Sequence, residues 1–198
     1  TATGGTSSFK TTRYGGHFLR MVAGIAAPSC FFVALKYLPL ADIIIIFFGG
    51  TFVITALSYP VLKERVGLHR TAAVVVGFLG VSLVVQPSGG VFQWAALVAA
   101  LGSVCYAITT VVGRKLSDTE DTFKLVFSTN LGIVLGASLF LPFQWTPMLP
   151  IDLGIVFLMT GFGLVGHICI IKAFSLAEVG SIAPFEYTGV IWAVLFGF

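Results

Sequence analysis

Two ionisable side chains stand inside long apolar runs of this sequence. Glu186 lies in "APFEYT" (183–188), well inside the last run, and His167 lies midway along the run before it. A charged side chain at the centre of a bilayer costs about 2.5–3.5 kcal/mol even on lenient scales, so such residues usually face the protein interior and serve function. Glu186 therefore predicts a site for a substrate cation or a proton. The structural alternative is a protonated carboxyl group bonded to a neighbouring helix. His167 likewise either bonds a substrate or bridges two helices.

Hydroxyl groups recur at helical spacing on two other apolar runs. Thr51 and Thr55 share one face of the second run, and Ser103 and Tyr106 share one face of the fourth. Such groups either line a cavity or bond their own or a neighbouring helix, which contributes only about 0.6 kcal/mol on average. Tyr187 flanks Glu186. Trp192 could stack on a planar substrate, or it could be an anchor at the membrane interface. The predicted substrate-binding residues are Glu186, Tyr187, His167, Trp192, Thr51, Thr55, Tyr106 and Ser103.

The sequence shows no pattern typical of an enzyme, a metal site or a cofactor site. It contains neither H-E-x-x-H nor G-x-S-x-G, and no span carries a pair of carboxylates in a catalytic pattern. The three cysteines fall inside apolar runs without a C-x-x-C spacing. We therefore expect no catalytic residues, no metal ligands and no cofactor.

The composition indicates a membrane protein. Hydrophobic residues make up 57% of the 198 and charged residues only 10%, with a mean hydropathy of +1.02. Soluble domains carry about 25% charged residues, so this chain could not cover its surface in water. No basic run interleaved with aromatic residues suggests a nucleic-acid partner. The expected partners are the lipid bilayer and a small-molecule substrate, and assembly as a homodimer stays open.

The apolar runs have the length of transmembrane helices, which need about 20 residues each. We expect an all-α integral membrane protein in which residues 1–17 form a loop or chain end. A chain that starts without Met and stops within an apolar run is also expected to be part of a longer protein. Seven spans are predicted near 18–38, 40–62, 70–87, 92–113, 123–143, 153–174 and 178–198.

The basic residues predict an orientation, because Lys and Arg concentrate in cytoplasmic loops. Three loops on the same side of the seven-span layout carry most of the Lys and Arg, which places residue 1 on the cytoplasmic side. We expect a bacterial inner membrane. Glu64, between Lys63 and Arg65, is expected to join an ion network in one of these loops. The basic residues on that side are Lys10, Arg13, Arg20, Lys63, Arg65, Arg70, Arg114, Lys115 and Lys124.

Two stretches five spans apart share a plan of apolar helix, short break and apolar helix. Residues 31–50 can be aligned with residues 170–189 without a gap. In the seven-span layout the two stretches cross the membrane in opposite directions. Inverted repeats of this kind are a common transporter architecture, with the substrate site at the repeat interface. The match has few identities, so it predicts an inverted repeat only weakly.

Three segments resemble the EamA-type members of the drug/metabolite transporter superfamily. They are "FFVALKYLPLADIII" (31–45), "LKERVGLHRTAAVVVGFLGVSLVVQP" (62–87) and "IAPFEYTGVIWAVLFG" (182–197). The resemblance implies ten helices in two inverted halves, of which this chain would hold the third to the ninth. Residues 18–87 would then belong to an incomplete first repeat, and residues 92–198 to a second repeat that lacks its last helix. Thr51 departs from the family pattern, because many relatives have a proline there.

The function expected from these observations is secondary transport by alternating access, with a small polar or amphipathic metabolite as the substrate. The alternatives from other classes are an intramembrane enzyme, such as a hydrolase or a lipid transferase, and a channel or structural membrane subunit. A channel should present rings or runs of like pore-lining groups, and the sequence shows none.

Overall fold

The predicted spans are helical in the computed structural model, which describes residues 13–64, 67–85, 94–144 and 149–197. The first part of the chain forms α1 (Tyr14–Leu35), α2 (Leu40–Phe48), α3 (Gly50–Leu57), the π-helical turn η2 (Ser58–Leu62) and α4 (Leu68–Val85). The second part forms α5 (Trp94–Ser117), α6 (Thr122–Gln144), α7 (Pro150–Leu176), α8 (Val179–Ile182), the 3₁₀ helix η4 (Ala183–Thr188) and α9 (Gly189–Gly197).

Their lengths confirm an all-α integral membrane protein. Five helical stretches of the described residues are long and apolar enough to cross a membrane. One of them is the stretch 40–62, in which α2, α3 and η2 together form a single span. The apolar part of α4, Leu68–Leu83, is shorter. One boundary differs from the prediction, because α1 begins at Tyr14 and not near residue 18. Gly15 and Gly16 favoured a loop there, but they continue the helix.

The second and the last spans are each broken into short helices. In the second span the break falls at Gly49, and the π-helical turn that contains Pro60 ends at Lys63 in the left-handed conformation (φ 59°). In the last span Pro184 lacks the N–H that would continue the α-helical ladder, and the chain tightens into η4. Broken helices of this kind place backbone and side chains inside a bundle at positions that a straight helix would not offer.

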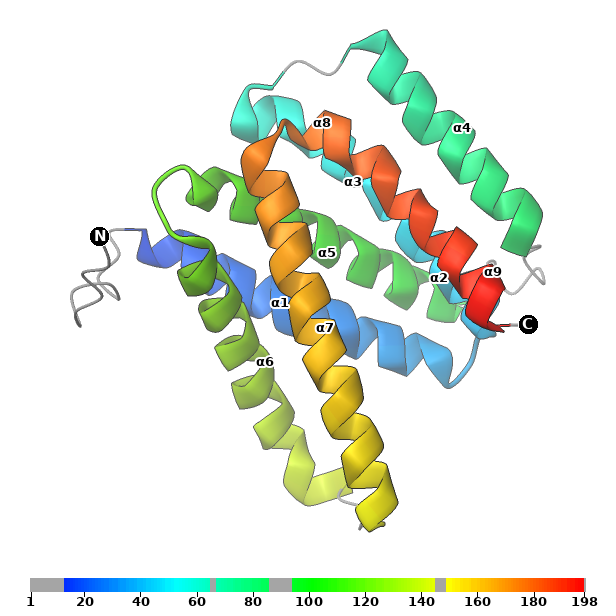
Figure 1. Ribbon diagram of the computed structural model, residues 1–198, viewed down its shortest axis with the longest axis vertical. Coiled ribbons are helices and arrows are strands. Elements are labelled where there is room, and N and C mark those ends of the chain that lie inside the picture. Colours follow the sequence, from blue (N-terminus) through cyan, green and yellow to red (C-terminus); the bar gives the residue numbers. More distant parts are fainter. Residues whose placement is uncertain (1–12, 65–66, 86–93, 145–148, 198) are drawn as a thin grey trace.

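The most extensive helix contact joins α1 to α5, and it depends on small residues. A Cβ added at Gly102 of α5 would lie 2.8 Å from Cβ of Cys30 and 2.9 Å from Cζ of Phe47. Likewise, a Cβ added at Gly16 of α1 would lie 3.0 Å from Cδ2 of Leu116. Close approach of backbones at small residues is the usual way in which membrane helices associate. In Figure 1, α1 and α5 lie side by side along the length of the bundle.

Helices α6 and α7 form a hairpin that diverges from the other helices toward its turn (Figure 1). The last two turns of α7 join the bundle, where Phe174 is 4% exposed and packs with Ile54, Ala107 and Val179. The most apolar 18-residue stretch of α7, in contrast, contains no buried residue. The core that positions the broken last span therefore lies between α3, α5 and the end of α7.

Candidate functional site

Glu186 meets side chains from two other helices inside the bundle. The Tyr106 hydroxyl of α5 donates a hydrogen bond of 2.7 Å to Oε1 of Glu186. The Thr51 hydroxyl of α3 donates to Oε2 over 3.5 Å, a longer and weaker contact. Thr51 is buried, while Glu186 and Tyr106 are half-buried. We call Glu186, Tyr106 and Thr51 the carboxylate cluster. It brings together three of the eight residues predicted from the sequence.

Two further predicted residues lie beside this cluster. The Thr55 hydroxyl donates to the carbonyl oxygen of Thr51 over 2.8 Å, one turn back along α3. Ser103 is buried and packs against Gly50, where an added Cβ would lie 2.8 Å from the serine Oγ. Gly50 thus lets α3 approach α5 closely enough for Thr51 and Tyr106 to reach the same carboxylate.

Tyr187, next to Glu186 in sequence, lies near Thr51 and also contacts another part of the bundle. Its hydroxyl donates to the carbonyl oxygen of Phe48 over 3.4 Å, and its ring packs with Val74 and with the Phe48 ring. The ring also lies against Gly77 of α4, where an added Cβ would fall 2.4 Å from the ring carbon Cδ2. In this arrangement Tyr187 joins η4 to α2 and α4. Trp192 of α9 is 59% exposed.

His167 of α7 is half-buried and faces Asn130 of α6, with 3.3 Å between its Nδ1 and the amide Nδ2. This contact bridges two helices, in agreement with the structural alternative for this histidine. His167 also lines a cavity of about 60 Å³ between α1, α5 and α7, to which Tyr106 contributes from the side of the carboxylate cluster. Tyr106 therefore lies between the carboxylate cluster and this cavity.

Arg20 is a residue of this cavity that the sequence analysis assigned to a basic loop. Because α1 begins at Tyr14, Arg20 lies in its second turn and its side chain is 1% exposed. Its position within the predicted span 18–38 was the signal that could have placed it in the helix and not in the loop.

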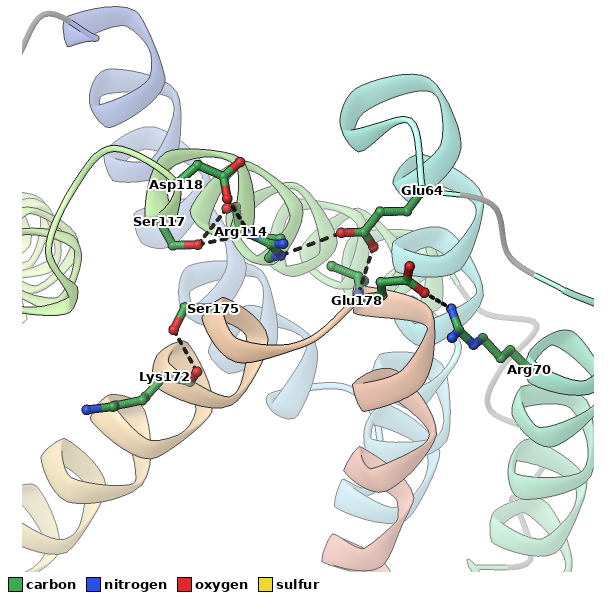
Figure 2. A network of polar contacts seen from close by, with 9 residues as sticks. Glu64, Arg70, Arg114, Ser117, Asp118, Lys172, Ser175 and Glu178 are labelled. Carbon is green, nitrogen blue, oxygen red and sulfur yellow. Dashed lines mark hydrogen bonds and ion pairs between the residues drawn. The ribbon is translucent and has the colours of Figure 1, made fainter.

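At the end of the bundle that carries the start of α1, charged groups join four segments (Figure 2). Glu64 places Oε1 3.5 Å from Nε of Arg114, and its Oε2 accepts a hydrogen bond of 2.8 Å from the backbone N–H of Val179. Arg114 also pairs with Asp118 over 2.6 Å. The prediction that Glu64 joins an ion network is confirmed, with a partner on α5. A further ion pair joins Arg70 of α4 to Glu178, which precedes α8.

The described residues contain no group of three or more His, Cys, Asp or Glu side chains that could hold a metal ion. A carboxylate with two hydroxyl donors can bind a cation, exchange a proton or accept further hydrogen bonds. Fold and site together define a membrane protein with an acidic group held inside its helical bundle.

Comparison with known proteins identifies the family. The model of the EamA-like transporter family matches residues 93–198. The chain is 28% identical to a pseudopaline exporter of Pseudomonas aeruginosa over 187 residues, 90% of this chain and 65% of that protein. It is 26% identical to a riboflavin transporter of Vibrio cholerae over 195 residues (96% and 64%). It is 23% identical to an S-adenosylmethionine uptake transporter of Rickettsia bellii over 184 residues (92% and 63%). No solved structure matches.

The chain belongs to the EamA-like transporter family, because the family model matches more than half of it. This confirms the family that the three sequence segments indicated, and it favours a transporter over the enzyme alternative. The chain spans 63–65% of the length of these three relatives.

Proposed function

We propose that this protein is a secondary transporter that moves a small polar or amphipathic metabolite across the membrane by alternating access. The observation that carries the proposal is the carboxylate cluster, in which Glu186 is held by Tyr106 and Thr51 within an apolar bundle. Family membership supports transport, and the printed names of the relatives describe both uptake and export of small molecules. The direction of transport is left open.

In this proposal Glu186 binds the cationic part of the substrate or a coupling proton. The hydroxyl of Tyr106 orients one carboxylate oxygen, and Thr51 approaches the other. Because a carboxylate in an apolar surrounding lacks water, a bound cation or proton replaces the missing solvation. Thr55 and Ser103 hold the helices of the cluster in place. Tyr187 joins the broken span to α4, so a change at Glu186 would be transmitted to that helix.

The proposed location is a bacterial inner membrane, with the start of α1 on the cytoplasmic side. Basic residues support the orientation, because Arg70 and Arg114 gather at the end of the bundle that carries that start. The bacterial relatives support the choice of membrane. The inverted repeat of residues 18–87 and 92–198 stays part of the proposal, as does assembly as a homodimer.

The test is exchange in proteoliposomes, with labelled S-adenosylmethionine and riboflavin as first probes because relatives are named for them. We expect saturable exchange of a metabolite that falls at least tenfold in Glu186→Gln, which keeps the shape of the side chain and removes its charge. Glu178→Gln is the matched control, since that carboxylate is half-exposed in a surface ion pair; its rate should stay within twofold.

Two results would contradict the proposal. Exchange that is unaltered in Glu186→Gln would remove the carboxylate cluster from the mechanism. Cleavage or transfer of a covalent bond in a candidate substrate, without any exchange, would instead support the enzyme alternative.

A further inference from the structure

The cavity between α1, α5 and α7 holds a buried positive charge. Its volume of about 60 Å³ exceeds the roughly 10–15 Å³ that one water molecule requires, so a group the size of a carboxylate fits. Arg20, Arg114 and His167 all line it, and none of the described lining residues is Asp or Glu. The wall of the cavity is therefore basic, although the surrounding bundle is apolar.

The guanidinium of Arg20 has donors to spare. Its Nε and Nη1 atoms are buried and have no hydrogen-bond partner among the residues that the structure describes. Nε of the neighbouring Arg114 also lacks a hydrogen-bond partner among the described residues, but Arg114 is ion-paired, because Glu64 lies 3.5 Å and Asp118 2.6 Å from its guanidinium nitrogens. A buried charge without a partner costs several kcal/mol, so it is usually kept only where it serves a function.

Gly113 of α5 fixes the place of this guanidinium. A Cβ added at Gly113 would lie 3.0 Å from Nη1 and 3.1 Å from Cζ of Arg20. The glycine therefore lets the planar head of Arg20 lie directly against α5. An arginine held in this way is prepared to bind a carboxylate with two parallel hydrogen bonds.

We propose that Arg20 binds a carboxylate of the transported solute in this cavity. The inference rests on the proposed function, because it makes the cavity a second part of the same substrate site. Tyr106 connects the two parts: it lines the cavity and donates to Glu186. One part carries a buried cation and the other a carboxylate, so together they suit a solute with both an anionic and a cationic group.

The spacing along α5 gives the size of that solute. Gly113, which contacts Arg20, follows Tyr106 by seven residues, which corresponds to roughly 10 Å along a helix. An ω-amino acid with a chain of several methylene groups spans a larger part of this distance than an α-amino acid does. The substrate class is thus a zwitterion whose two charges lie several bonds apart.

The experiment is a thermal-shift titration of the protein in nanodiscs with hexanoate, hexylammonium, 6-aminohexanoate and glycine. We expect 6-aminohexanoate to bind more tightly than either single-charge probe and than glycine. In Arg20→Met the apparent Kd for hexanoate should rise at least tenfold, while the Kd for hexylammonium changes less than twofold. Glu186→Gln should show the reverse pattern. Lys115→Met, which removes an exposed charge from α5, is the control and should change neither Kd.

The melting temperature of the ligand-free protein separates this proposal from a purely structural role. Removal of an unpartnered buried charge should raise the Tm of Arg20→Met, whereas removal of a structural arginine should lower it. Gly113→Ala is a second variant that keeps the charge but displaces the guanidinium, and it should also weaken hexanoate binding.

A lower Tm together with an unchanged Kd for hexanoate in Arg20→Met would overturn the proposal. Equal affinity for inorganic phosphate and hexanoate in the wild type would overturn the carboxylate assignment. If exchange survives in Glu186→Gln while Arg20→Met still loses hexanoate binding, the carboxylate site stands and the proposed role of Glu186 fails.

Discussion

Glycines on α5 and on α7 have opposite surroundings, although both helices are long and apolar. An added Cβ at Gly102 or Gly113 of α5 would meet side chains of α1 at about 3 Å. The glycines of α7 (154, 161, 163 and 166) have nothing within 4 Å of such an atom. The α1–α5 contact is therefore fixed by shape, while the surface of α7 is free to meet lipid or other helices.

This difference shows why composition alone does not predict helix packing in a membrane. Lipid tails are as apolar as leucine side chains, so burial of an apolar surface against protein gains little. Close contact between helices then depends on small residues that let two backbones approach. Gly102 meets this condition because Cys30 and Phe47 lie opposite to it, and an identical residue on α7 lacks such a neighbour.

The largest change in stability should come from α7, which has one phenylalanine packed in the bundle and another on its exposed surface. Phe174→Ala removes a phenylalanine that is 4% exposed, and Phe162→Ala removes one that is 78% exposed on the same helix. We expect Phe174→Ala to lower the free energy of unfolding by roughly 2–3 kcal/mol. This is less than the ~3–5 kcal/mol of water-soluble cores, because lipid already surrounds the ring in separated helices. Unfolding in mixed micelles measures the free energy of unfolding of both variants. An equal decrease in the two variants would show that the surface of α7 around Phe162 is packed as well.

A smaller effect should come from glycines at the two kinds of surface. Gly102→Ala places a methyl group 2.8 Å from Cβ of Cys30, so α1 and α5 must separate, at a cost of about 1–2 kcal/mol. Gly161→Ala makes the same chemical change in open space and should cause no loss. The melting temperatures of the two variants, measured in the same nanodiscs, decide the point. An unchanged Tm for Gly102→Ala would mean that the close contact between α1 and α5 does not stabilise the bundle.

The smallest effect concerns Gly24 on α1, where an added Cβ would meet a single methyl group, Cγ2 of Thr129, at 3.0 Å. We expect Gly24→Ala to change stability by less than about 1 kcal/mol, because one methyl group must shift while alanine favours the helix. Thr129→Ser removes that methyl group and keeps the hydroxyl that bonds the Leu125 carbonyl. In a double-mutant cycle the two changes should couple favourably. Additive effects would show that the contact imposes no constraint.

Much of the fold could be predicted from the sequence because membrane spans are specified locally. The apolar runs and the basic loops each correspond to a feature of the structure. The error at the start of α1 came from Gly15 and Gly16, which are local breakers in water but continue a helix that packs closely on α5. Arg20 fell inside the predicted span 18–38 but was grouped with the preceding basic loop, and in the structure it is the most completely buried cation of the cavity wall.

The sequence predicted which types of residue form the candidate site, but it only partly predicted which individual residues belong to it. Glu186 was identifiable because a carboxylate within an apolar run is costly wherever it lies. Tyr106 and Thr51 were two among several hydroxyl-bearing residues at helical spacing, and sequence alone could not rank them. Tyr187 adjoins Glu186 in sequence, but the 3₁₀ geometry of η4 places its ring against α4.

By itself, then, the sequence determined that this chain crosses a membrane as helices and that an acidic residue lies within the bundle. It also determined which end of the bundle carries the positive charge. These properties depend on hydrophobicity and charge summed along short segments. Only the tertiary structure decided that Tyr106 binds Glu186, that the Tyr187 ring packs against α4, and that Arg20 faces a cavity. Those contacts join residues from separate helices, and their geometry depends on how closely glycine allows each pair of backbones to approach.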